Sequence, residues 1–104
     1  MAAHLTKLEF RVWRPMDELH GSPAIIEMRR QLRMADYHFR ESAQDGFDID
    51  PLHISTRINW TGEAECLFII EAPATEGAIS LAWRSAVATI GLRTERITTP
   101  MQGD

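Results

Sequence analysis

The chain has 104 residues, 44% of them hydrophobic, which suffices for one modest core and predicts a single domain over residues 1–104. Its 15 acidic side chains outnumber the 11 basic ones, and the formal charge of -4 argues against nucleic acid or an anionic membrane as a partner. A single cysteine excludes an internal disulfide, and the longest apolar run, 66–70, is far shorter than the roughly 20 residues of a membrane span. Because residues 1–10 lack the apolar stretch of a secretion signal, we expect a cytoplasmic location.

Residues 5–13 predict a strand with one buried side. Leu8, Phe10 and Val12 alternate there with charged or amphipathic side chains, at the period of two that a half-buried strand requires. Pro15 has no backbone N–H to donate to a sheet, so we expect the strand to end before it.

A long amphipathic helix follows the first strand. Ser22 is suited to cap its N-terminus, and Pro23 suits the first helical position because its missing N–H would have had no partner there. The pattern continues to about Ala43, which makes about 20 residues, and Gly46 is expected to end the helix. Apolar residues at intervals of three and four define its buried stripe: Ile25, Met28, Leu32, Ala35 and Phe39.

The segment from Leu52 to Ala72 is typical of a β-hairpin, because turn residues at 61–63 separate two runs rich in β-branched and aromatic side chains. The inward set of the first run is Leu52, Ile54, Thr56, Ile58 and Trp60. The second run is apolar on both faces, with Cys66, Phe68 and Ile70 on one and Leu67 and Ile69 on the other. We place the Phe68 face in the core, because glutamates flank the other face. A strand that is apolar on both sides is a central strand or faces a partner.

A second helix and a last strand complete the predicted elements. Thr75 marks the start of the helix, and Glu76 lies in the first turn, where a negative charge suits the helix dipole. Gly91 is well placed as the left-handed residue that ends it. Its apolar face consists of Ile79, Ala82, Trp83, Ala86, Val87 and Ile90. The charges of the short strand at 92–98 suit an exposed sheet edge, and residues 99–104 are expected to fray.

The order of these elements predicts an α+β fold, the ferredoxin-like βαββαβ plait. We expect a four-stranded sheet in the order 4-1-3-2, with the first and third strands side by side and parallel in the middle, and both helices on one face. The resemblance is to a fold and covers almost the whole chain, but no family motif accompanies it. Because this fold hosts many unrelated functions, function has to be argued from particular side chains.

The sheet face that the helices leave open is the main candidate functional surface. It combines an apolar centre with a ring of mixed charge, and such patches mark contact sites. We predict that it associates with a second copy of the chain, as a homodimer, or with another protein, through Trp13, Leu67, Ile69 and Arg11. The competing interpretation is that the charges pair across strands, Arg11 with a neighbouring glutamate, and shield two tolerated surface aliphatics.

A small-molecule site is a second possibility. His53 and Arg57 are expected on the open sheet face. Together with Trp13 they would line the pocket of a small enzyme or ligand-binding regulator of the dimeric α/β-barrel kind. The pocket would lie between the helices and the sheet or across the dimer.

Arg14 and His20, in the loop before the first helix, belong to a further candidate site. We expect the starts of both helices to meet at one edge of the sheet, where their unpaired N–H groups and Arg14 would hold a small anion. The competing interpretation is that the helix caps are filled internally, by Ser22, Thr75 and Glu76.

No convincing catalytic constellation is present, so the leading hypothesis is a non-catalytic module without a cofactor. Cys66 is predicted inward, where a thiol behaves as a small hydrophobe. The four histidines lack the short spacing of a metal-binding pair, and the acidic residues at 45–50 lack the order of a calcium loop.

RNA binding is the third possibility, because four arginines give the first helix a basic tint: Arg29, Arg30, Arg33 and Arg40. RNA binding through this fold uses exposed aromatic side chains on the central strands, and only Trp13 is clearly available on the open face. The net negative charge opposes it as well. We expect these arginines to be solvated and to pair with Glu27 and Glu41.

Overall fold

The computed structural model describes residues 5–15 and 21–97. These ranges contain, in chain order, β1 (Thr6–Trp13), α1 (Gly21–Phe47), the 3₁₀ helix η1 (Pro51–His53), β2 (Ser55–Gly62), β3 (Glu65–Ala72), α2 (Glu76–Ile90) and β4 (Arg93–Ile97). The order is that of a βαββαβ plait, as predicted. Residues 99–104, which were expected to fray, lie outside the described ranges.

The strands form one sheet in the order β2-β3-β1-β4, which confirms the predicted order and the central position of β3. Every pair is antiparallel, so the prediction that β1 and β3 run parallel is wrong. The reason is the number of times that the chain reverses direction between β1 and β3. The chain turns back through α1, runs forward again in β2 and reverses at the hairpin, so β3 runs against β1.

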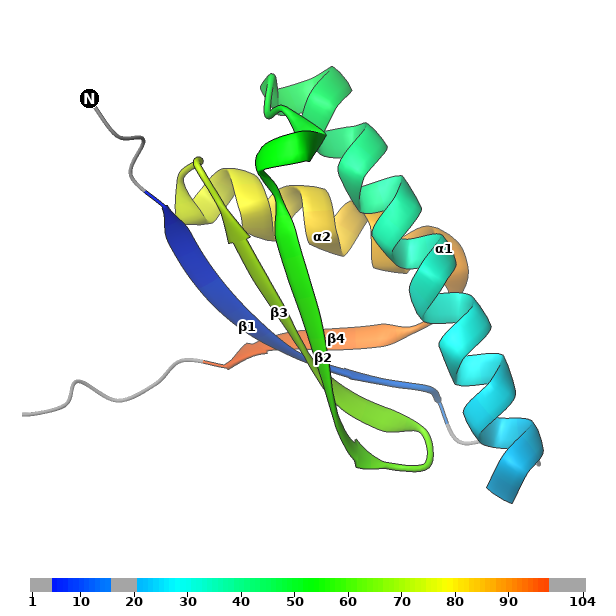
Figure 1. Ribbon diagram of the computed structural model, residues 1–104. Coiled ribbons are helices and arrows are strands. Elements are labelled where there is room, and N and C mark those ends of the chain that lie inside the picture. The colour runs from blue at the N-terminus through cyan, green and yellow to red at the C-terminus, as the bar shows by residue number, and fades with distance from the viewer. Residues whose placement is uncertain (1–4, 16–20, 98–104) are drawn as a thin grey trace, which may run out of the picture.

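The helices pack against one face of the sheet and against each other, and the core lies between the layers (Figure 1). Trp83 of α2 is its largest fully buried side chain. Its ring stacks on Phe68 with centroids 4.2 Å apart, and it contacts Phe10 and Phe39 at 5.9 Å each. Because these three rings come from β3, β1 and α1, one side chain joins both layers.

A short hydrogen-bond relay extends this packing to the edge strand β4. The indole Nε1 of Trp83 donates to the hydroxyl of Thr94 at 3.0 Å, and that hydroxyl donates to the backbone carbonyl of Arg11 at 2.9 Å. The indole N–H of the buried Trp83 and the half-buried Thr94 hydroxyl thereby both find acceptors, as buried polar groups require.

Helix α1 is longer than predicted, at 27 residues, and it begins at Gly21 rather than after a Ser22 cap. Gly46 lies inside the helix. The left-handed residue at the end is Asp48, with φ 56°, and the following N–H of Ile49 donates to the carbonyl of Ala43 at 3.0 Å. Aspartate is one of the few side chains that tolerate this backbone conformation, so glycine was the wrong marker here. The buried stripe is Ala24, Met28, Leu32, Ala35, Phe39 and Ala43, and Ile25 is only half-buried.

Helix α2 has the ends that its sequence predicts. The hydroxyl of Thr75 accepts a hydrogen bond from the N–H of Ala78 at 3.2 Å, and Glu76 lies in the first turn. Gly91 follows the helix with φ 85°, and its N–H donates to the carbonyl of Val87.

Strand β2 begins three residues later than predicted. The carboxylate of Asp50 accepts from the N–H of Leu52 at 2.9 Å and caps η1, so Leu52 and His53 belong to this turn of helix and not to the sheet. Leu52 is 90% exposed, so its predicted inward position is wrong. A proline at the first position of η1 favours the turn over an extended strand.

Candidate functional site

The open face of the sheet carries the four side chains that the sequence assigned to an interface. In an antiparallel sheet, residues directly opposite each other point to the same side. Leu67 lies opposite Arg11, Ile69 lies opposite Glu9, and Trp13 follows at the same parity along β1. The face therefore contains Trp13, Leu67, Ile69 and Arg11 together.

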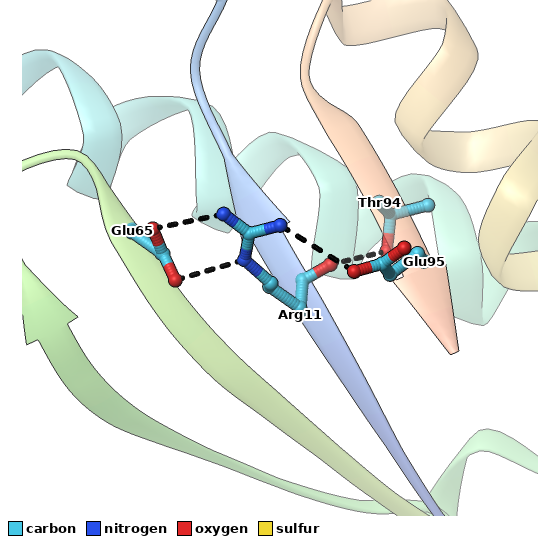
Figure 2. Close-up of polar contacts among 4 residues, drawn as sticks. All are labelled: Arg11, Glu65, Thr94 and Glu95. Atoms are coloured by element: carbon cyan, nitrogen blue, oxygen red, sulfur yellow. Dashed lines mark hydrogen bonds and ion pairs between the residues drawn. The ribbon is translucent and has the colours of Figure 1, made fainter. Parts of the chain in front are cut away.

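Arg11 is the most highly connected side chain on this face (Figure 2). Its Nε donates to Glu65 Oε2 at 2.9 Å and its Nη2 to Glu65 Oε1 at 3.3 Å, while its Nη1 reaches Glu95 Oε1 at 3.4 Å. The guanidinium carbon also lies 4.3 Å from the centroid of the Trp13 ring. Arg11 thus links β3, β1 and β4, and the competing interpretation correctly predicted that it pairs with a neighbouring glutamate.

These contacts shift the titration of both partners. The hydrogen bonds from Arg11 hold the pKa of the Glu65 carboxyl below its ordinary value, and Glu65 raises the pKa of Arg11 in return. Both side chains remain partly exposed, so solvent screens the pair. The network fixes the orientation of side chains more than it stabilises the fold.

The apolar centre of the open face is smaller than the sequence pattern indicates. Ile69 is only 6% exposed, because neighbouring side chains on its own sheet cover it, and Leu67 is half-buried. Lys7, Arg57 and Glu71 surround the shallow depression beside Ile69. What remains accessible is the rim of Leu67, part of the Trp13 ring and the half-buried Ile97.

Charges on this face are balanced. The register places four basic and four acidic side chains on it: Lys7, Arg11, Arg57 and Arg93 against Glu9, Glu65, Glu71 and Glu95. The chain as a whole carries a formal charge of -4, so the excess negative charge lies elsewhere. A neutral face with both signs interspersed suits a partner that is also neutral and mixed.

The predicted small-molecule pocket of Trp13, His53 and Arg57 is not assembled within one copy of the chain. Trp13 lies opposite Glu65, at the end of the sheet where β2 finishes, whereas His53 precedes the start of β2. The two side chains therefore lie at opposite ends of the sheet, so one copy of the chain does not bring them together, and a pocket across a dimer stays a prediction. His53 Nδ1 is 4.0 Å from an Asp50 carboxylate oxygen and the side chain is exposed.

The predicted anion site between two helix N-termini is wrong. Because β1 and β3 are antiparallel, their ends lie at opposite edges of the sheet, and so do the helix starts that follow them. The backbone N–H of Arg14 donates to the Ala64 carbonyl at 3.1 Å near one edge, while Thr6 Oγ1 donates to the Ala74 carbonyl at 2.6 Å near the other. His20 lies outside the described residues.

A second concave surface lies on the other side of the sheet, between α1 and β2. In Figure 1 these elements approach each other near η1 and diverge toward the start of α1. At the narrow end, Arg40 donates to the carbonyls of Pro51 and Ile54 and to the hydroxyl of Thr56, at 3.1–3.2 Å. At the wide end is a cavity of about 310 Å³, which we call the α1–β2 groove. Its lining residues are Arg29, Leu32, Arg33, Asp36, Thr56, Arg57, Ile58, Trp60 and Phe68.

The apolar lining of this groove comes from side chains that the sequence assigned to the core. Ile58 and Trp60 point to the helix side of β2 as predicted, yet they are 37% and 38% exposed because α1 does not cover them. Leu32 and Phe68 are fully buried and form the floor. Alternation along β2 predicts the direction of these side chains and contains no information about the distance to α1.

The sequence pattern indicated the basic character of α1 but did not place its arginines beside a groove. Arg30 pairs with Glu27, as expected. Arg29 and Arg33 pair with neither Glu27 nor Glu41, and among the described residues neither they nor Arg57 form an ion pair. The spacing of Arg29 and Arg33, four residues apart and hence on one side of a helix, was the available signal.

Other chemical candidates have the properties of structural residues. Cys66 is fully buried, and burial together with the charge of Glu65 raises the pKa of its thiol to about 12, so the thiolate is absent near neutral pH. In the described part of the chain no three His, Cys, Asp or Glu side chains converge to hold a metal ion. None of the helices in residues 5–15 and 21–97 has both the length and the apolar character needed to cross a bilayer.

No family model matches the chain, and comparisons with curated proteins and with solved structures give no match. The fold and the two surfaces described above are therefore the basis for a functional proposal.

Proposed function

We propose that the protein is a non-catalytic module that associates with a second copy of itself through the open face of its sheet. The observation that carries this proposal is the balance of four basic and four acidic side chains around the accessible parts of Leu67 and Trp13. In a two-fold symmetric pair the same face meets itself, so each basic group can lie near an acidic group of the other copy. A surface of one sign would repel its copy instead.

The size of the face sets the expected strength. Four strands about 4.8 Å apart, with up to eight residues of about 3.4 Å each, give a projected area of roughly 500 Å². Stable interfaces bury about 800 Å² on each partner. Since Ile69 is already covered by its own sheet, the proposal is a weak dimer that exchanges with monomer at about micromolar concentrations or above.

The preset geometry of Arg11 supports association. Its two hydrogen bonds to Glu65 and its contact with Trp13 hold three side chains of the face in place before a partner arrives. Side chains that are already ordered lose less conformational entropy on binding. The RNA-binding alternative has less support, because among the described aromatic residues of the sheet only Trp13 faces outward.

Sedimentation velocity over a concentration series tests the proposal. The wild type is expected to shift from monomer to dimer mass, and Leu67→Glu is expected to remain monomeric because it places a charge at the centre of the contact. Leu81→Glu is the matched control, since Leu81 is exposed on α2 and the substitution is identical. Monomeric wild type at every concentration, or dimers of Leu67→Glu as strong as those of wild type, would contradict the proposal.

A further inference from the structure

We infer that the α1–β2 groove binds a small aromatic anion, a molecule with a carboxylate or similar acidic group on a planar ring. The inference does not depend on self-association, because the groove lies on the helix side of the sheet and the proposed dimer face on the other. Its volume of about 310 Å³ lies at the lower end of the range for small-molecule sites, which is large enough for one or two fused rings.

Charge complementarity defines the acidic part of the ligand. Arg29 and Arg33 lie one turn apart on α1, line the groove and form no ion pair with any residue in the described ranges. Arg57 only borders the groove from β2, because the register turns its side chain toward the open face. The one carboxylate in the lining, Asp36, is engaged by Arg40 at 3.2 Å. The groove is therefore basic in a chain whose formal charge is -4. Guanidinium groups bind carboxylates through two parallel hydrogen bonds, so an acidic group is the fitting counterpart.

The uncharged lining defines the planar part. Trp60 and Ile58 both line the groove, and they are 38% and 37% exposed. The guanidinium carbon of Arg29 lies 5.8 Å from the Trp60 ring centroid, so a cation and an aromatic face already adjoin. A flat ring would stack on Trp60 above the floor of Leu32 and Phe68, while its acidic group meets the arginines.

The narrow end of the groove is fixed, which favours a site of constant shape. Arg40 holds α1 to the carbonyls of Pro51 and Ile54 and to the Thr56 hydroxyl, next to the groove. The C-terminal part of α1 cannot separate from the start of β2 without breaking three hydrogen bonds that the Arg40 guanidinium donates. A ligand would therefore meet a preformed concavity rather than induce one.

Titration of the wild-type protein with 2-naphthoate, followed by the amide and indole signals in NMR spectra, tests the inference. Because the ligand is small, we expect a Kd of about 1 mM or tighter, with shifts confined to the groove and the Trp60 indole. The neutral analogue 2-naphthalenemethanol supplies only the planar ring, and inorganic phosphate supplies only the negative charge. Both are expected to bind at least about tenfold more weakly than 2-naphthoate.

Two arginines of the same helix provide the matched variants. Arg33→Gln removes a groove charge and is expected to weaken 2-naphthoate about tenfold, whereas Arg30→Gln makes the same change at a residue that pairs with Glu27 outside the groove and should leave binding unchanged. Unchanged thermal melting of both variants separates lost binding from lost folding. The inference is overturned if 2-naphthoate fails to shift the groove signals, if the neutral analogue binds equally well, or if Arg30→Gln weakens binding as much as Arg33→Gln.

Discussion

The helix-facing side of the sheet has a closed half and an open half, although β1, β2 and β3 all point apolar side chains toward the helices. In the closed half, Phe10 and Phe68 lie under Trp83, which fills the space between α2 and the sheet. In the open half, Ile58 and Trp60 point the same way but α1 diverges from them. The difference shows that strand periodicity determines the direction of a side chain, and the helix packed above it determines whether that side chain is buried.

The two tryptophans provide the largest test of this difference. Trp83→Ala is expected to lower the free energy of unfolding by about 3–5 kcal/mol, because it leaves a large cavity among three phenylalanine rings. Trp60→Ala is expected to cost less, about 1–2 kcal/mol, since over a third of the residue is already in solvent. Urea denaturation of both variants measures the two values. Equal losses would mean that the helices bury the inward side chains of β2 to the same extent as those of β1 and β3.

A second pair compares threonine hydroxyls in the two halves. Thr94→Val leaves the buried indole N–H of Trp83 without its acceptor and is expected to cost about 1–3 kcal/mol. Thr56→Val removes one of several acceptors of Arg40, which keeps two carbonyls and access to water, so we expect a loss below about 1 kcal/mol. Both values come from the same urea titrations. A larger loss in the free energy of unfolding for Thr56→Val than for Thr94→Val would mean that the groove side is the more tightly packed half.

Arg40 tests what keeps the narrow end of the open half in place. Arg40→Met retains much of the aliphatic stem and removes the donors to Pro51, Ile54 and Thr56, with an expected loss of about 1–2 kcal/mol. Arg30→Met is the control, because its exposed pair with Glu27 contributes about 0.5 kcal/mol or less. Hydrogen exchange of residues 51–56 should accelerate in the first variant only. Equal exchange in both would show that η1 holds without Arg40.

The smallest expected effect concerns the outward face and depends on pH. The pKa of Glu65 is lower in the folded chain than in the unfolded chain, so its contribution to stability is present above the unfolded pKa and is lost as the pH falls through the folded value. Glu65→Gln should therefore be less stable than wild type at about pH 7 and equally stable at about pH 2. A difference in unfolding midpoint that persists at low pH would assign the effect of Glu65 to packing instead of charge.

Much of the fold was predictable because local chemistry determines it. Thr75 and Gly91 delimit α2 through a side-chain cap and a left-handed glycine, and both signals lie within a few residues of the helix ends. The end of α1 was missed because Asp48 takes the conformation usually left to glycine. The strand order followed from the element order, whereas the strand directions required counting the reversals of the chain.

The functional surfaces were less predictable, and for different reasons. The register placed Arg11 and Leu67 on one outward face, which alternation alone could indicate. The α1–β2 groove joins Arg33 to Trp60 across 27 positions of sequence and depends on the angle between a helix and a strand, for which no local pattern exists. His53 was misplaced because the proline before it starts η1 and delays the strand.

The position of β1 has a consequence for biosynthesis. One neighbour of this strand, β3, is separated from it by about half of the chain, and the other, β4, leaves the ribosome after every other described strand. Until residues 93–97 emerge, β1 keeps an unpaired edge on which foreign chains can add a strand. Nascent chains arrested before Arg93 should therefore depend on chaperones more than chains released after Ile97.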